Sequence, residues 1–163
     1  MVKPYRMIDN NTLNNIFGRS SNYNAQFGTS ILDMLANKYN IVITDVVRTE
    51  IRANPNYGGA GGVFDTWMQG KDITPLITLV DSSLPDAGEL SMNKAFDTLK
   101  AAGHDVGIIS DDVSFYNETK NPDGSYKSPE GAPYVKHTSQ IQDVANTLLK
   151  DGLPITDYQI LRN

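Results

Sequence analysis

The sequence predicts an α/β domain in which a mostly parallel sheet is covered by helices on both faces. Short β-branched runs alternate with stripes of apolar residues at helical spacing, which is typical of strands joined by helices. Apolar residues make up 39% of the chain and charged residues 20%, which excludes a disordered chain. With 163 residues and no repeat or linker, residues 1–163 are expected to form a single domain with one core.

The apolar runs and stripes give the expected elements in chain order. Strands are predicted at residues 5–8, 41–43, 76–80, 106–109 and 155–161, the last as an edge strand. Helices are predicted around residues 13–17, 27–35, 46–54, 64–68, 87–102 and 144–149. The polar stretch at residues 117–136 is rich in Pro and Gly and is expected to be a long excursion from the domain.

The composition excludes several classes of site. The chain has no Cys, which excludes disulfides, thiol nucleophiles and Cys-based zinc sites, and its two His residues argue against an imidazole-rich site. The net charge of −5 argues against a broad basic surface for nucleic acid, although a site that holds cations with carboxylates is itself acidic. No apolar run approaches the roughly 20 residues of a membrane span, and no signal-peptide core is expected.

Several acids are predicted to lie at one edge of the sheet. Asp9 directly follows the first predicted strand, and Asp111 and Asp112 directly follow the fourth. The carboxyl ends of the strands form the ligand-binding edge of an open α/β sheet. If the two strands are neighbours, we expect these carboxylates to share one cleft.

Two further acids fall beside apolar stripes of predicted helices. Glu50 borders the apolar face of the helix after the second strand, and Glu89 extends the stripe of the 87–102 helix at its beginning. An ionised carboxylate in such a position is costly unless a partner compensates it. A bound cation would compensate several of these acids together.

Each acid also has a purely structural interpretation. Asp9 can be the N-cap of the helix that follows it, and Asp111 or Asp112 can cap another helix. Glu89 can complement a helix dipole, and Glu50 can extend its carboxylate outward to solvent from a boundary position.

At these residues the sequence resembles the PIN-domain nucleases. The similar segments are Asp9-Asn10-Asn11-Thr12-Leu13, Val46-Val47-Arg48-Thr49-Glu50-Ile51, Gly88-Glu89 followed by Ala95, and Ile108-Ile109-Ser110-Asp111-Asp112 with Phe115. The likeness covers most of residues 5–116. It implies a three-layer α/β/α sandwich with strand order 3-2-1-4-5, and Mg²⁺- or Mn²⁺-dependent cleavage of RNA or, less often, DNA.

The resemblance also implies roles for individual residues. The expected catalytic acids are Asp9, Glu50, Glu89 and Asp112, and the expected metal set is Asp9, Glu50, Glu89, Asp111 and Asp112. Hard divalent cations prefer such carboxylate oxygens. Asn11 offers a neutral hydrogen bond to substrate, and Arg48 and Arg52, one turn apart, can contact phosphate or form an ordinary solvated face.

Small members of this family are commonly toxins or effector domains. The resemblance therefore implies an RNA substrate, an inhibitory antitoxin or immunity partner, and action in the cytoplasm, with delivery inside a larger secreted effector as one route. Two alternatives stay open. One is a non-catalytic α/β binding or adaptor module. The other is a haloacid-dehalogenase-type phosphatase, although Asp9, Asn11 and Thr12 have a spacing one residue short of that family's first motif.

Overall fold

The fold is α/β, as the sequence predicts, with a parallel sheet at its centre. The computed structural model describes residues 3–17, 24–55, 57, 62–111, 138–139 and 141–162. The strands are β1 (Tyr5–Ile8), β2 (Asn40–Val42), β3 (Val106–Ile109) and β4 (Thr138–Ser139). They lie in the order β2-β1-β3-β4, and every pairing is parallel. The carboxyl ends of β1 and β3 therefore meet at one edge of the sheet.

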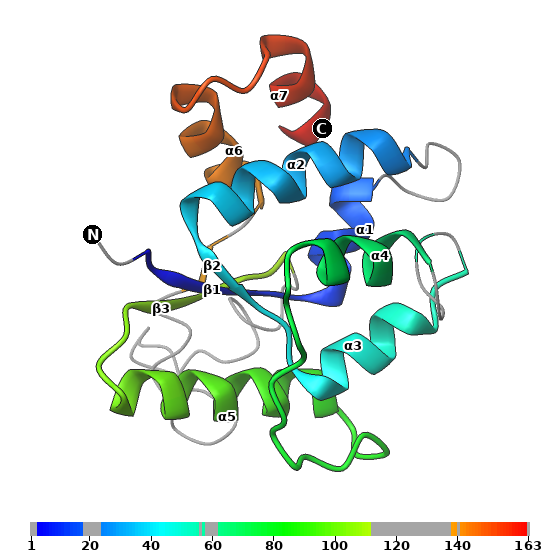
Figure 1. Cartoon of the computed structure of the whole chain (residues 1–163), viewed down its shortest axis with the longest axis vertical. Helices are drawn as coiled ribbons and strands as arrows, with labels where there is room; N and C mark the ends of the chain where they lie inside the picture. Colours follow the sequence, from blue (N-terminus) through cyan, green and yellow to red (C-terminus); the bar gives the residue numbers. More distant parts are fainter. Residues whose placement is uncertain are drawn as a thin grey trace, which may run out of the picture.

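Helices cover both faces of this sheet. They are α1 (Asn10–Phe17), α2 (Ala25–Lys38), α3 (Asp45–Arg52), α4 (Val63–Gly70), α5 (Ala87–Ala101), α6 (Ile141–Lys150) and α7 (Ile155–Arg162). Figure 1 shows α5 on one side of the sheet and α2 on the other, with α6 and α7 beyond α2. All four residues of β3 are buried, because side chains on both faces of this strand are covered.

The predicted five-strand order is not confirmed. The central order β2-β1-β3 does correspond to the predicted neighbours 2-1-4. At the expected third strand, residues 76–80, only Leu76 pairs in parallel with Thr44 beyond the end of β2. The Asp45 carboxylate accepts hydrogen bonds from the Thr78 amide and hydroxyl, and Leu79 has φ +62°, so the segment does not continue as a strand.

The predicted edge strand at residues 155–161 is wrong, because this segment is the helix α7. Tyr158 and Leu161 lie three residues apart on the face that is partly or fully buried, whereas Ile155 and Ile160 are exposed. The Tyr158 hydroxyl also donates to Asn146 of α6. Packing against α6 thus selects the helix.

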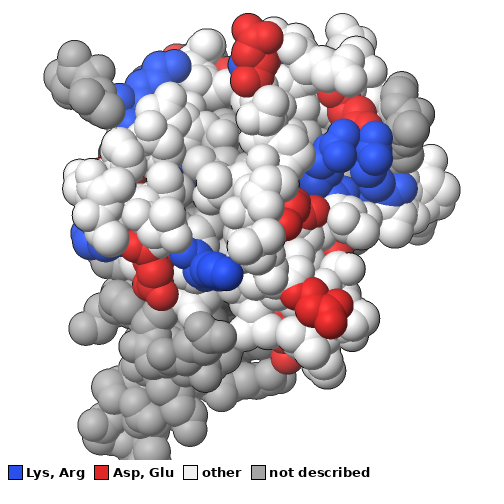
Figure 2. Space-filling model, turned by 60° about the horizontal axis from the view of Figure 1, so that its bottom comes forward, with Lys and Arg blue, Asp and Glu red and all other residues white. Residues whose placement is uncertain are grey.

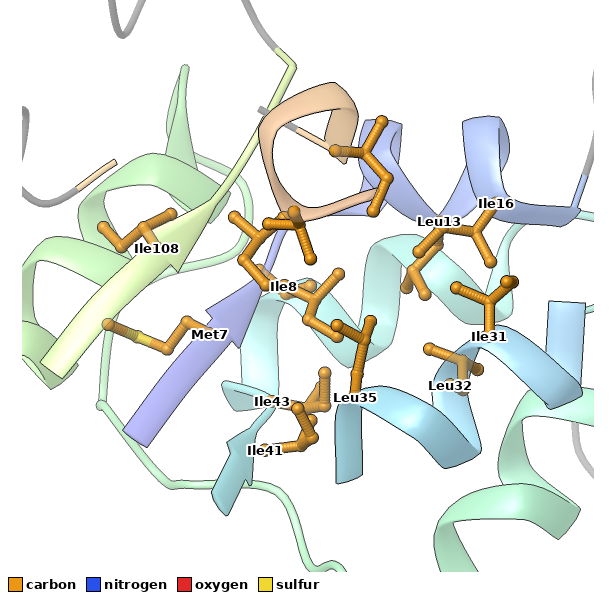
Figure 3. Packing of buried hydrophobic residues seen from close by; sticks show 14 of the residues in the cluster. Met7, Ile8, Leu13, Ile16, Ile31, Leu32, Leu35, Ile41, Ile43 and Ile108 are labelled. Carbon is orange, nitrogen blue, oxygen red and sulfur yellow. The ribbon is translucent and has the colours of Figure 1, made fainter. Parts of the chain in front are cut away.

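The core joins the sheet to the helices around it. Figure 3 shows Ile8 of β1 beside Leu35 of α2, and Leu13 of α1 facing Ile31 of α2. All four side chains are at most 1% exposed. Burying a side chain of this size contributes about 1.5–3 kcal/mol. This packing fixes the beginning of α1 directly after β1, at the edge where the candidate acids lie.

Candidate functional site

Asp9 is held firmly at the carboxyl end of β1. Its amide donates to the Ile109 carbonyl at 3.0 Å, and its own carbonyl accepts from Leu13 at 3.2 Å, so it links the sheet to α1. The side chain is buried, with Oδ1 accepting from the Asn10 amide at 2.7 Å and Oδ2 from the Ser110 hydroxyl at 2.8 Å. Asp9 thus occupies the N-cap position of α1, and its carboxylate has a fixed orientation.

Glu50 of α3 reaches the beginning of α5. The residue before α5, Asp86, has φ +56° and makes no side-chain capping hydrogen bond. Instead, the backbone N–H of Gly88 donates to the carboxylate of Glu50. A carboxylate at this end of a helix is favoured by unpaired N–H groups and the helix dipole. Glu50 therefore caps a helix that lies far from it in sequence.

The carboxylates of Glu50 and Asp9 repel each other across the site. Burial raises the pKa of the Glu50 carboxyl, and the negative charge of Asp9 raises it further, while the hydrogen bond from Gly88 acts in the opposite direction. None of the ion pairs between described residues includes Glu50. The fold thus brings two predicted site acids, 41 positions apart in the sequence, into one electrostatic pair, and no Lys or Arg of the described segments forms an ion pair with Glu50.

Asp111 follows β3 and makes the contacts of a helix cap. Its Oδ1 accepts from the Ile141 amide at the start of α6, and its Oδ2 accepts from the Asn15 side chain, both at 2.9 Å. The Asp111 amide in turn donates to Oδ1 of Asn11 at 3.3 Å. These contacts match the structural interpretation of Asp111, and they tie the predicted substrate residue Asn11 to the same edge of the sheet.

Arg48 and Arg52 converge on a buried acid of α4. Nε and Nη2 of Arg52 donate to Oδ2 of Asp65 at 3.0 and 2.8 Å, and Nη2 of Arg48 lies 3.5 Å from the same oxygen. Asp65 is 4% exposed, whereas the arginine side chains are 30% and 39% exposed. Two guanidinium groups on one carboxylate leave a net positive charge, but Asp65 fixes both groups and gives them a structural role.

Of the two remaining predicted acids, the structure describes Glu89 but not Asp112. Glu89 is partly buried in the first turn of α5, next to the residue that binds Glu50. Asp112 lies outside the described residues. Within the described ranges, no three Asp, Glu or His side chains form a group that could hold a metal ion. The described site is therefore the Asp9–Glu50 pair with the first turn of α5 beside it.

Three residues in this region were not predicted to have a role there. Ser110 orients Asp9, Gly88 binds Glu50, and Asp65 binds the two arginines. Ser110 and Gly88 did lie within the compared motifs, next to the predicted acids. Asp65 could have been found from its position beside apolar Phe64, where a charged side chain requires a cationic partner.

The described residues on the α5 side of the surface form no continuous basic area. Figure 2 shows Lys and Arg there in separate groups, interspersed with Asp and Glu. This distribution agrees with the net charge of −5.

No family model, curated protein or solved structure matches this chain. Among the helices of the described segments, none combines the length and hydrophobicity that a membrane span requires.

Proposed function

We propose that this protein is a Mg²⁺- or Mn²⁺-dependent endoribonuclease of the PIN-like type, acting as a toxin or effector domain. The observation that carries the proposal is the Asp9–Glu50 pair at the carboxyl edge of the sheet. A fold gains no stability from placing two carboxylates where each repels the other. A divalent cation between them removes that repulsion.

The donor set fits a hard cation. Asp9 and Glu50 supply carboxylate oxygens on two different elements, and both are oriented by hydrogen bonds, from Ser110 and from Gly88 respectively. Glu89, Asp111 and Asp112 complete the proposed set. A cation held there supplies a Lewis acid and an activated water for attack on a phosphodiester. The acidic residues bind and orient the cation. We propose that Asn11, Arg48 and Arg52 contact the RNA. An inhibitory protein restrains the activity in the cytoplasm.

The direct test is cleavage of a fluorescently labelled RNA pool in Mn²⁺. The variants are Asp9→Asn, Glu50→Gln, Glu89→Gln and Asp112→Asn. Each should lower cleavage by more than about 100-fold, because even residues that only support metal ligands are worth about 10–100-fold. The control is Asp97→Asn, which removes one exposed carboxylate from α5. Full activity in Asp9→Asn or Glu50→Gln would refute the proposal, as would wild-type protein that cleaves no RNA.

One observation favours the alternative of a non-catalytic binding module. The contacts of Asp9, Glu50 and Asp111 are all compatible with helix capping, which stabilises a fold without any chemistry. The two functions differ in their response to metal. A nuclease should gain thermal stability with Mn²⁺, and Asp9→Asn should abolish that gain. A module that uses these acids only as caps should show no shift in either protein.

A further inference from the structure

The carboxylate of Glu50 approaches the backbone of α5 unusually closely. An ideal Cβ built on Gly88 would lie 2.5 Å from Oε1 of Glu50, 2.9 Å from Oε2 and 3.0 Å from Cδ. Real Cβ atoms essentially never come this close to another heavy atom. Residue 88 must therefore lack a side chain for Glu50 to occupy its observed place.

The contact is also directional. The N–H of Gly88 donates to the Glu50 carboxylate, in a helix whose own N-cap residue makes no side-chain capping hydrogen bond. α3 and α5 pack extensively against each other, so the two backbones cannot easily separate to admit a methyl group. The flexible end of Glu50 is the part that would move.

We infer that Gly88 is a positioning residue for the candidate site, because its missing side chain and its N–H together place the Glu50 carboxylate beside Asp9. The effect of Gly88 on metal binding rests on the proposed function, because it assumes that Glu50 and Asp9 are metal ligands. It assigns to Gly88 a role that is separate from that of the adjacent acid Glu89. A methyl group at position 88 displaces the carboxylate from Asp9 while leaving the helix intact, since Ala is the better helix former.

The first experiment needs no metal and no activity. Free energies of unfolding are measured by urea denaturation in EDTA for wild type, Gly88→Ala, Glu50→Ala and the double variant. Gly88→Ala should be less favourable to stability when Glu50 is present than when residue 50 is Ala, because the space is then open. The matched control is Gly70→Ala at the end of α4, where a Cβ meets nothing within 4 Å. Its effect should be the same in both backgrounds.

The second experiment measures the Mn²⁺ dissociation constant by calorimetry. Gly88→Ala should weaken Mn²⁺ binding about 10–100-fold, the range expected for residues that orient metal ligands, and Gly70→Ala should leave it unchanged. Equal effects of Gly88→Ala in both backgrounds of the first experiment would overturn the inference. So would unchanged Mn²⁺ affinity in Gly88→Ala, because the contact would then be purely structural.

The experiments distinguish failure of the nuclease proposal from failure of the inference about Gly88. If wild-type protein neither binds Mn²⁺ nor cleaves RNA, the nuclease proposal fails. The unfolding cycle then decides by itself whether Gly88 positions Glu50.

Discussion

The substitution Asp9→Asn tests whether the Asp9 carboxylate stabilises the fold or serves to bind a cation. Asn retains the Oδ1 acceptor for the Asn10 amide, and the Ser110 hydroxyl can rotate to accept from the new amide group. Both hydrogen bonds lose their charge assistance, at a cost of roughly 1 kcal/mol each. The expected loss from hydrogen bonding is therefore about 2 kcal/mol.

The same substitution removes the repulsion between Asp9 and Glu50. Two like charges about 4 Å apart repel by about 4 kcal/mol at an effective dielectric constant of 20, and by about half of that at twice the separation. Because Glu50 is only partly buried, solvent reduces this gain further. The gain and the loss are of similar size, so Asp9→Asn should be within about 1 kcal/mol of wild type in EDTA.

Asp9→Ala is the matched comparison. It relieves the same repulsion, but it removes the acceptor of two hydrogen bonds. These are the bonds donated by the Asn10 amide and by the Ser110 hydroxyl. Each lost contact costs about 1–3 kcal/mol, so the Ala variant should be roughly 3 kcal/mol less stable than the Asn variant.

Urea denaturation followed by circular dichroism at pH 7 measures all three proteins. Adding Mn²⁺ at about 100 times its dissociation constant should stabilise the wild type by about 2.7 kcal/mol and leave both variants unchanged. Two results would refute the reasoning. One is a loss above about 2 kcal/mol in Asp9→Asn in EDTA, which would make the carboxylate structural. The other is an equal stabilisation by Mn²⁺ in the Asn variant and the wild type.

Three further predictions test the surroundings of the site. Because the pKa of Glu50 is raised in the folded state, the native protein holds this proton more tightly than the unfolded chain, so its contribution to stability should fall as pH rises above about 4.3. Glu50→Gln should remove this fall from the pH series of urea midpoints, and parallel series would contradict the assignment. Gly28→Ala places a Cβ 2.5 Å from Cε1 of the buried ring of Phe17, and overpacking of about 1–3 kcal/mol should exceed the helix gain of about 1, lowering the melting temperature. An unchanged or higher melting temperature would show that the ring moves freely. Asp65→Ala removes both hydrogen bonds to Arg52 and should cost about 2 kcal/mol in a denaturant series, less than a fully buried pair because the arginine is partly exposed. A loss below about 0.5 kcal/mol would mean that water replaces the carboxylate at no cost.

The positions of the three central strands along the chain could be predicted from the residues because each is a short apolar run, whereas their order in the sheet was expected only from the resemblance to the PIN-domain nucleases. The predicted helix at residues 87–102 closely matches α5, which ends at Ala101. The prediction of a strand at residues 155–161 was wrong. There the buried residues are three apart, at Tyr158 and Leu161, and tertiary packing against α6 decides between helix and strand.

The candidate site was predictable only in part. Asp9 could be placed because it follows a strand, and the ends of parallel strands share an edge. The contact between Glu50 and Gly88 depends on how α3 packs against α5, which no periodicity within either helix specifies. The shared use of Asp65 by Arg48 and Arg52 likewise depends on the packing of α4. The roles of Glu89 and Asp112 stay predictions.

The charges around Glu50 distinguish a helix cap from a metal ligand. A carboxylate that only caps α5 is most stable when it is fully ionised and close to positive charge. Arg48 and Arg52 lie on the same helix as Glu50, yet both bind Asp65, and among the described residues the charge that raises the pKa of Glu50 is the negative one of Asp9. For capping alone this arrangement is inferior to one without Asp9. For binding a divalent cation, two carboxylates from different elements, each held by a hydrogen bond, supply oxygen ligands of the kind that the ion prefers.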